Sequence, residues 1–394
     1  MKILVISHWY FIEVESIFIR KQVQELQKQG CNVKVVSPTP WTPFPIKYFR
    51  KRWRDYSKIP NKMMTGDIEV YYPRYVDFPR SFLLGASGRR MHSGIKKTVD
   101  KLYAQFPFDI IHAHAALPDG YAAMMLSREY HTPFIITLRA TDLDITIHKS
   151  QQCFDIIHDV LKSATKVVVP SPRLSRTLYQ QMGFQSSVIS HGIHKHELFL
   201  SNNINSTYQE KYPVILSVSQ LMASKGIDLN IRAVALLEKK YPKIHYLIIG
   251  EGEERTRLTN LVKDLNLQGK VEFLGQLPYQ KVMEYMSLCD IFCLPSWQET
   301  LGLVYLEAMA HGRPIVGCQG QGVDGLITTG ETGLLAKPKD IDSIVDAIDF
   351  LAANRERALT IGRKAKILIL ENYTWEKNAE KTIQLFRDVV SSSL

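Results

Sequence analysis

The chain has no long hydrophobic run. Nowhere in its 394 residues is there a stretch that approaches the roughly 18 consecutive apolar residues of a membrane-spanning helix. The first residues, Met1 to Ile6, run directly into a strand pattern and lack the regions of a signal peptide. Low-complexity tracts are also missing. We therefore expect a globular protein that stays in the cytoplasm, with disorder confined to loops and ends.

Cysteine is scarce and irregularly spaced. The five cysteines are an odd number, and no two of them form a Cys-x-x-Cys pair. This spacing argues against both a disulfide framework and a zinc site. We expect them to be small, buried apolar residues. They are Cys31, Cys153, Cys289, Cys293 and Cys318.

Acidic residues are outnumbered by basic ones, which leaves a formal net charge of +10. Such an excess requires an anionic partner, which can be a nucleotide, a nucleic acid or an acidic lipid. No recognised nucleic-acid-binding motif accompanies the charge. We therefore expect no nucleic acid among the partners.

The length exceeds what one ordinary core supports, so two α/β domains of about 200 residues each are expected. Short β-branched runs alternate with helical segments, which is the pattern of a parallel sheet. We expect a Rossmann-like domain over residues 1–206, a second over residues 207–374, and a C-terminal helix over residues 375–394 that packs back on the first domain. Helical spacing alone would allow that helix to pack on either domain. The expected strands are Ile3–Ser7, Val33–Ser37, Ile110–His112, Phe134–Leu138, Val167–Pro170, Val188–Ser190, Val214–Val218, Tyr246–Gly250, Val271–Leu274, Ile291–Leu294 and Pro314–Gly317.

The stretch that carries the most chemistry runs from Leu294 to Val316. Open α/β sheets bind ligands beyond the carboxyl ends of their strands, and here a strand ends, a polar loop follows and Gly302 opens a helix. The free N–H groups at Gly302 and Leu303 suit a diphosphate. Glu307 lies about 7 Å further along the helix, which matches the step from phosphate to ribose hydroxyls. Spacing alone equally allows a buried amphipathic helix with two solvated acids.

The two acids of this stretch are Glu299 and Glu307. They are separated by seven residues, with glycine at the helix start and an Ala-rich turn that ends in Gly-x-Pro. This pattern resembles the signature of family 4 retaining glycosyltransferases of the GT-B fold, in which two Rossmann-like domains face each other across a cleft. The resemblance covers nearly the whole chain. Further matches are Lys225-Gly-Ile-Asp228, Gly250-Glu-Gly252 and Glu331-Thr-Gly333.

The resemblance implies transfer of a hexosyl unit from a nucleoside diphosphate sugar, with retention of configuration. The expected donor is a UDP-hexose, with UDP-glucose as the first choice, and neither a cofactor nor a metal is expected. Lys225 would neutralise the departing diphosphate, and Glu299 would orient the sugar. The closest likeness is to bacterial surface-polysaccharide enzymes of the teichuronic acid type, which use lipid-linked or oligosaccharide acceptors. A nucleotide-sugar epimerase of the same fold and a catalytically weak nucleotide-sugar-binding relative remain alternatives.

The N-terminal half carries a second set of matches. His112 and His114 resemble the strand-end histidine pair of the family, and Leu138-Arg-Ala-Thr-Asp142 resembles its His-Gly-Thr-Asp turn. His114 lies nearer the carboxyl end of the strand and is expected to face the transferring sugar, whereas His112 is expected to be a packing residue. Asp142 either contacts the sugar or caps a turn.

Three departures from the family pattern affect residue-level expectations. Members of the family usually have Gly-Arg-Leu where this chain has Ser219-Gln220-Leu221. Gln220 therefore occupies the position of an arginine that binds the sugar donor. The glycine-rich loop after the first strand is replaced by residues 7–16, which contain no glycine. Residues 191–196 carry three histidines in place of Asn-Gly-Val-Asp, and these suit a solvated hinge loop better than a metal site.

Cations and aromatic residues alternate in the segment from residue 46 to residue 54, as they do at membrane interfaces. The sequence therefore predicts a peripheral contact with an anionic membrane surface, on the inner face of the cytoplasmic membrane. A solvated basic loop is the alternative. The residues proposed for the contact are Phe49, Trp53, Phe82 and Leu83 with Arg50, Lys51, Arg52 and Arg54.

Overall fold

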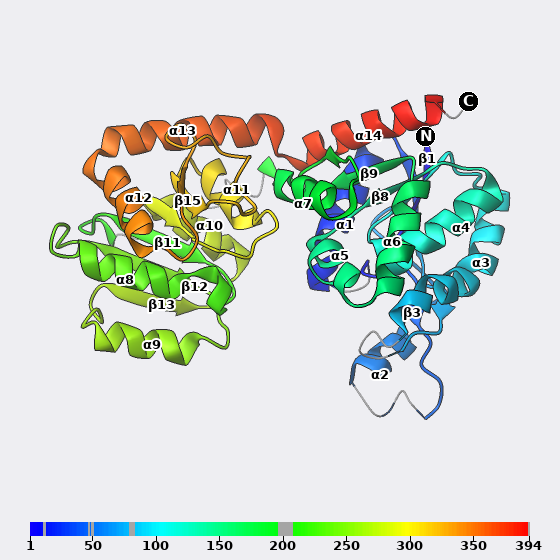
Figure 1. Ribbon diagram of the computed structural model, residues 1–394, viewed down its shortest axis with the longest axis horizontal. Coiled ribbons are helices and arrows are strands. Elements are labelled where there is room, and N and C mark those ends of the chain that lie inside the picture. The colour runs from blue at the N-terminus through cyan, green and yellow to red at the C-terminus, as the bar shows by residue number, and fades with distance from the viewer. Residues whose placement is uncertain (11–12, 46–47, 49–50, 79–82, 196–207, 393–394) are drawn as a thin grey trace. The chain divides into compact units, whose positions relative to one another are not determined.

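The computed structural model describes residues 1–10, 13–45, 48, 51–78, 83–195 and 208–392 (Figure 1). The chain divides into two compact units. The first comprises Met1–Pro170, Leu174–Ile189 and Asn378–Leu394, and the second comprises Ser171–Arg173 and Ser190–Lys377. Each unit contains a mainly parallel sheet with helices, so the expected fold of two Rossmann-like α/β domains is confirmed.

The sheet of the first unit has the strand order β10-β9-β8-β7-β1-β2-β5-β4. Neighbouring strands are parallel, except that β4 pairs antiparallel with β5. A separate pair, β3 with β6, lies outside this sheet. The strands are β1 (Lys2–Ile6), β2 (Asn32–Val36), β3 (Thr39–Pro40), β4 (Lys62–Thr65), β5 (Ile68–Tyr71), β6 (Arg74–Tyr75), β7 (Ile110–Ala113), β8 (Phe134–Thr137), β9 (Lys166–Val169) and β10 (Ser187–Val188).

Two hydrophobic clusters in the first unit include residues that alternate along its strands. Leu4 and Ile6 of β1 belong to one cluster, and Ile3 and Val5 belong to the other. This alternation buries both faces of the sheet beneath helices. The helices of the first unit are α1 (Glu13–Lys28), α2 (Lys51–Lys58), α3 (Ser87–Gln105), α4 (Tyr121–Tyr130), α5 (Ala140–Asp144), α6 (Gln151–Ser163) and α7 (Pro172–Met182).

The C-terminal helix α14 (Trp375–Ser392) packs on the first unit from Asn378 onward. Its apolar residues Ala379, Ile383, Phe386 and Val389 belong to the same cluster as Ile3 and Val5. Polar contacts fix its register: Gln22 of α1 donates hydrogen bonds to Asn378 Oδ1 at 2.8 Å and to Thr382 Oγ1 at 3.3 Å. The last segment of the chain therefore completes the core begun by the first strand.

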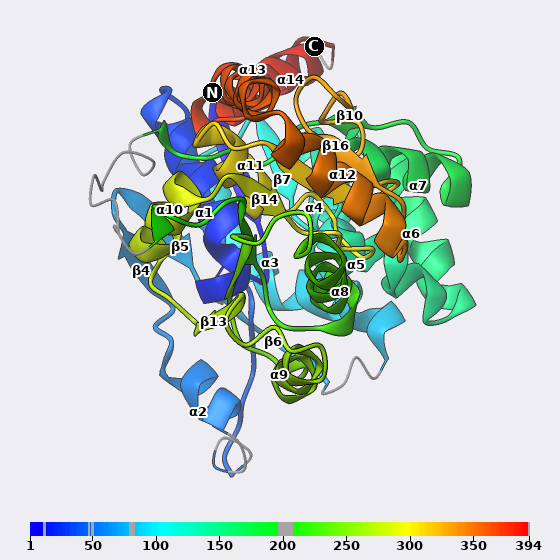
Figure 2. The same ribbon diagram turned by 90° about the vertical axis from the view of Figure 1, so that its left-hand side faces the viewer.

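The sheet of the second unit has the order β13-β12-β11-β14-β15-β16, and all its neighbouring strands are parallel. Helices α8 and α12 pack side by side against it (Figure 2). The strands are β11 (Val214–Val218), β12 (His245–Ile249), β13 (Val271–Gly275), β14 (Ile291–Cys293), β15 (Ile315–Cys318) and β16 (Leu334–Ala336). The helices are α8 (Ile227–Leu237), α9 (Arg255–Asp264), α10 (Tyr279–Leu288), α11 (Leu303–Ala310), α12 (Ile341–Ala353) and α13 (Arg355–Asn372).

The two ends of the second unit are held together. Ile193, near its beginning, forms a parallel bridge with Thr374, near its end. The amide of Ile193 donates to the carbonyl of Tyr373 at 3.0 Å, and the amide of Trp375 donates to the carbonyl of Ile193 at 3.2 Å. The segment that enters this unit and the segment that leaves it are thus neighbours.

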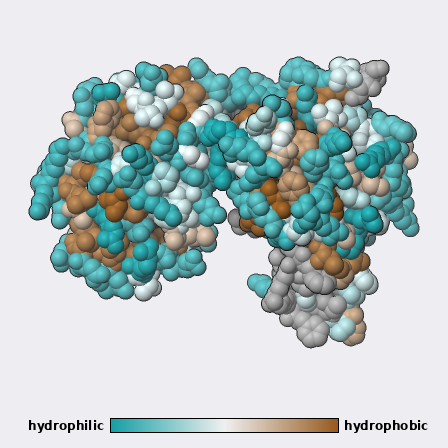
Figure 3. Space-filling model, viewed as in Figure 1, coloured by the Kyte–Doolittle hydropathy of each residue, from teal (hydrophilic) through white to brown (hydrophobic). Residues whose placement is uncertain are grey.

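The surface is that of a protein with scattered apolar residues. Hydrophilic residues cover most of the visible face of each unit, with hydrophobic residues between them (Figure 3). Within the described ranges, no helix combines the length and the apolar character that crossing a membrane requires. All five cysteines are free and buried, as expected.

Candidate active site

The topology of the second unit creates a ligand position beside β11. This strand pairs with β12 on one side and with β14 on the other, so the chain order reverses between β11 and β14. Ligands of open α/β sheets bind at the carboxyl ends of the strands at such a switch point. The loop after β11 leads to Lys225, and the loop after β14 leads to Glu299 and Gly302.

Lys225 and Glu299 form an ion pair. Lys225 Nζ lies 2.8 Å from Glu299 Oε2, and the two side chains are only 18% and 16% exposed. The backbone also joins their loops, because the amide of Trp297 donates to the carbonyl of Ser224 at 3.0 Å. Two residues that the sequence predicted separately, for the diphosphate and for the sugar, are therefore in direct contact.

Gly302 begins helix α11 beside this ion pair. Its φ of 72° is in the left-handed region, and a Cβ at this position would lie 2.6 Å from the Tyr305 ring and 3.2 Å from Cγ of Glu299. Only glycine fits such a position without strain. No side-chain hydrogen bond caps the helix, which leaves the amide of Leu303, its first residue, for a ligand.

Two further residues that the sequence predicts to bind the sugar donor differ in their exposure to solvent. Glu307 is buried on α11. The side chain of Gln220 is exposed in the loop after β11. That loop is approached closely by the backbone at Gly250, where a Cβ would lie only 1.8 Å from the carbonyl oxygen of Ser219. This contact explains why the Gly-Glu-Gly turn begins with glycine.

The two histidines predicted from the sequence, His112 and His114, lie at the carboxyl end of β7 in the first unit. His112 is fully buried, its Nε2 lies 2.8 Å from Thr137 Oγ1, and its ring meets the Phe386 ring edge-on at 5.3 Å. Burial lowers the pKa of His112 to about 3, so it is a neutral packing residue. His114 lies just after the strand, 3% exposed, with its ring 4.1 Å from that of His112.

Asp142 occupies a capping position. Its carboxylate oxygens accept hydrogen bonds from the amides of Ala116 at 2.9 Å and Arg139 at 2.8 Å. Burial raises its pKa to about 6 in spite of these bonds. Of the two alternatives for Asp142, the structure shows the cap, and a sugar contact stays a prediction.

A third polar group was not predicted from the sequence. His8 follows β1, Asp119 follows β7, and His8 Nδ1 lies 2.8 Å from Asp119 Oδ1. Arg139, which follows β8, places its guanidinium 4.7 Å from the ring of Trp9. One signal was available: these residues all follow parallel strands that are neighbours in the sheet, so they share one edge of it.

Comparison of the sequence with known proteins identifies the family. Residues 16–197 match the model described as Glycosyltransferase Family 4, and residues 202–368 match the model described as Glycosyl transferases group 1. Over 357 residues the chain is 30% identical to TuaC of Bacillus subtilis, a glycosyltransferase assigned to teichuronic acid biosynthesis, and the match covers 88% of each protein. The chain belongs to the family 4 glycosyltransferases.

Solved structures agree on the fold of this family 4 glycosyltransferase. Sucrose-phosphate synthase from Thermosynechococcus elongatus superposes with a TM-score of 0.78 at 21% identity, and all of both chains is covered. HepE of Anabaena, in complex with UDP and glucose, superposes with a TM-score of 0.70 at 19% identity, covering 98% of this chain and 100% of HepE. These likenesses place the glycosyltransferase in the GT-B class of folds.

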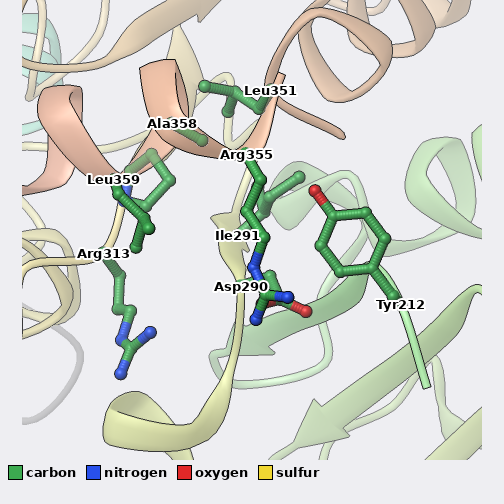
Figure 4. Close-up of a pocket in the computed structure, with 9 residues that line it drawn as sticks. Tyr212, Asp290, Ile291, Arg313, Leu351, Arg355, Ala358 and Leu359 are labelled. Atoms are coloured by element: carbon green, nitrogen blue, oxygen red, sulfur yellow. The ribbon is translucent and has the colours of Figure 1, made fainter. Parts of the chain in front are cut away.

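A separate pocket of this glycosyltransferase lies at the opposite end of the second sheet (Figure 4). Its lining includes Asp290, just before β14, with Arg313 and Arg355. The volume of about 20 Å³ admits about one water molecule, which is far too little for a sugar nucleotide. Asp290 accepts a hydrogen bond from the amide of Val214 at 2.8 Å, so we interpret this pocket as structural.

The histidine loop lies at the beginning of the second unit. The rings of His191 and His194 lie 5.9 and 6.4 Å from that of Trp375, and His196 is outside the described residues. Among the residues that the structure describes, no three His, Cys, Asp or Glu side chains are grouped so that they could hold a metal ion. The described histidines are packed on an aromatic ring in this glycosyltransferase.

Proposed function

We propose that this glycosyltransferase moves a hexosyl unit from a UDP-hexose, with UDP-glucose as the first donor to test, to a polysaccharide or lipid-linked acceptor, with retention of configuration. The observation that carries the proposal is the Lys225–Glu299 pair at the uncapped start of α11. HepE, which binds UDP and glucose, supports the choice of donor. TuaC, a glycosyltransferase assigned to teichuronic acid biosynthesis, supports the acceptor class.

The chemistry follows from the charges at this position. Breaking the bond between the sugar and the phosphate leaves negative charge on the nucleoside diphosphate. Lys225, the amides at Gly302 and Leu303 and the dipole of α11 stabilise that charge. A diphosphate competes with Glu299 for Lys225, and this exchange leaves the Glu299 carboxylate to accept hydrogen bonds from sugar hydroxyls.

Glu307 provides the first test, because its proposed contact is with the ribose and not with the hexose. Replacing Glu307 by alanine should weaken the binding of free UDP and of UDP-glucose equally. The loss of a charged hydrogen-bond acceptor costs about 1.5–3 kcal/mol, or at least tenfold in affinity. Thermal-shift titrations with a panel of nucleotide sugars measure this, since a ligand of the folded state raises the melting temperature.

The matched control for this test is Glu356→Ala, which removes an exposed glutamate from α13 of the same unit. It should leave UDP binding unchanged. Unchanged UDP affinity in a folded Glu307→Ala protein would contradict the ribose assignment. A change of the sugar in the donor without an acceptor would instead identify an epimerase.

Metal independence is also part of the proposal. Lys225 and the amides of α11 supply the positive charge that a divalent ion supplies in other transferases. Turnover should therefore be the same before and after dialysis against EDTA. Loss of turnover that magnesium restores would show that the protein groups are insufficient.

The structure changes the residues proposed for a membrane contact. Trp53 packs, half-buried, against the core cluster of the first unit, whereas Leu83 is 54% exposed, and a membrane contact of either stays a prediction. Phe49, Arg50, Phe82 and the side chain of Arg52 lie outside the described residues. Three exposed aromatic residues precede α2 in the chain: Trp41, Phe44 and Tyr48 are 57%, 78% and 57% exposed.

These three aromatic residues and the exposed cations Lys51, Arg54 and Lys58 of α2 form the proposed interfacial patch. Each cation near an anionic surface contributes about 1 kcal/mol. Replacing all three by serine should therefore lower binding to phosphatidylserine vesicles about 100-fold at low salt. Liposome sedimentation measures the effect, and raised salt should weaken binding of the unmodified protein.

The control for the patch removes the same charge from the second unit, by replacing the exposed Lys239, Lys263 and Lys364 with serine. Vesicle binding of this control should be unaffected. If both triple variants lost binding equally, net charge and not the interfacial patch would be responsible.

A further inference from the structure

Three loops of the second unit meet at Glu299. They follow β11, β14 and β15, which are consecutive neighbours in the sheet. The loop after β14 carries Glu299, and the loop after β11 carries Lys225, whose Nζ lies 2.8 Å from Glu299 Oε2. The loop after β15 carries Gln321, whose Oε1 accepts a hydrogen bond from the backbone amide of Glu299 at 3.2 Å. Glu299 is thus held by a cation from one neighbouring loop and by a neutral carboxamide from the other.

Gly322 brings the loop after β15 against the loop that carries Glu299. A Cβ at Gly322 would lie 2.6 Å from the backbone nitrogen and Cα of Leu301, so only glycine allows this approach. The next residue, Val323, is 1% exposed and belongs to the same core cluster as Leu301. The backbone path of its loop therefore fixes Gln321 beside Glu299.

The loop after β15 does not depend on the side chain of Gln321 for its own shape. Backbone groups close its turn, since the amide of Asp324 donates to the carbonyl of Gln321 at 2.8 Å and the amide of Gln321 donates to the carbonyl of Cys318 at 3.3 Å. The carboxylate of Asp324 accepts a further hydrogen bond from the amide of Gly320. The side chain of Gln321 acts outside its own loop, where it contacts the amide of Glu299.

The contact with the Glu299 amide decides how the carboxamide of Gln321 is turned. An N–H donor requires an acceptor, so Oε1 faces Glu299, and the Nε2 group with its two hydrogens is left as a donor. Among the residues that the structure describes, no group accepts a hydrogen bond from Nε2, and the side chain is only half-buried. The carboxylate of Glu299, which bonds to Lys225 and to the amide of Thr300, can only accept. Gln321 and Glu299 thus offer a ligand a donor and an acceptor from neighbouring loops.

We propose that Gln321 is a specificity-determining residue for the hexosyl group: Nε2 donates a hydrogen bond to one hydroxyl of the hexose, while Oε1 keeps Glu299 in place. The proposal rests on the proposed function, in which Glu299 accepts hydrogen bonds from the sugar and Lys225 binds the diphosphate. A neutral carboxamide suits an uncharged hydroxyl, whereas the cation in the loop after β11 suits the phosphates. Gln321 therefore acts on the sugar and not on the nucleotide.

The test compares how tightly the whole protein binds UDP-glucose and free UDP, by isothermal titration calorimetry. Gln321→Ala should weaken the binding of UDP-glucose roughly five- to tenfold, the effect of one lost hydrogen bond, and should leave UDP affinity unchanged. Gln321→Met keeps the length of the side chain without its polar atoms and should behave in the same way, which separates the lost hydrogen bond from a collapse of the loop. Gln319→Ala, which removes an exposed glutamine of the same loop, is the control and should bind both ligands like the unmodified protein.

Deoxy donors test the contact itself. They are analogues of UDP-glucose that each lack one hydroxyl of the glucose. The unmodified protein should bind one of them about as weakly as Gln321→Ala binds UDP-glucose. Gln321→Ala should not distinguish that analogue from UDP-glucose, because the two changes remove the same hydrogen bond. If both proteins showed the same losses for every analogue, the proposal would be overturned.

The remaining outcomes separate this proposal from the proposed function. Equal losses of UDP and UDP-glucose affinity in Gln321→Ala would show that Gln321 only supports the loops, and would overturn the proposal. If no UDP-hexose binds the unmodified protein, the proposed function fails, and this proposal fails with it. If UDP-glucose binds normally and Gln321→Ala binds it as tightly as the unmodified protein does, this proposal alone fails.

Discussion

Replacing Lys225 by alanine is expected to slow sugar transfer by about 100- to 1000-fold, the range seen when a preorganised group that stabilises developing negative charge is removed. The effect should be large because Gln220, at the position of the usual arginine, is uncharged and cannot compensate. The substitution also leaves the Glu299 carboxylate without its partner at 2.8 Å, next to the expected diphosphate. Like charges then face each other, so donor affinity should fall as well.

Steady-state rates of UDP release at saturating donor, together with UDP titrations, separate these two losses. The matched control is Lys281→Ala, which removes an exposed lysine of α10 that pairs with Glu284 on the surface. That variant should transfer sugar at the unmodified rate. A Lys225→Ala protein that keeps full turnover would remove Lys225 from the mechanism and would leave the helix start as the sole stabilising group.

The largest effect on stability is expected from Phe386→Ala in α14. Phe386 is completely buried and joins the C-terminal helix to the core that contains β1. Truncating a buried phenylalanine costs about 3–5 kcal/mol, because a cavity replaces its contacts. For a unit of this size, the melting temperature should fall on the order of 10 °C.

Calorimetry in the presence and absence of UDP distinguishes the two units in this experiment. Donor binding is proposed for the second unit, so UDP should still stabilise that unit in the variant. Gln384→Ala, on the exposed side of α14, removes a surface hydrogen bond to Asp388 and should cost only a few tenths of a kcal/mol. If Phe386→Ala melted like Gln384→Ala, α14 would contribute little to the core of the first unit.

The central strands could be predicted because buried parallel strands are short, continuous apolar runs. The runs predicted at Ile3–Ser7 and Val214–Val218 correspond to β1 and β11, each within one residue at either end. The sequence pattern did not predict five strands, β3, β4, β5, β6 and β16. Strands β3, β6 and β16 have only two or three residues, and β4 begins with Lys62, so none of these four shows a clear apolar period. Strand β5 (Ile68–Tyr71) does alternate buried and half-buried residues, but it is only four residues long.

The site could be predicted in part, for a physical reason. Lys225, Glu299 and Gly302 were recognised from local motifs, but their contact depends on β11 and β14 being neighbours, which spacing does not reveal. The contact between His8 and Asp119 depends in the same way on the pairing of β1 with β7. The packing of Trp53 against the core could not be predicted either, because an alternation of cations and aromatic residues does not tell which ring faces the core.

The bridge between Ile193 and Thr374 has a consequence for how this enzyme can change over generations. Residues 190–377 form one continuous segment whose two ends are adjacent. The part of the gene that encodes this segment could therefore be replaced by the corresponding part of a related gene. Recombination with one breakpoint on each side of that bridge would replace the proposed donor-binding half in a single event. The core that α14 completes would be inherited intact, so a lineage could exchange its proposed donor-binding unit without rebuilding the first unit.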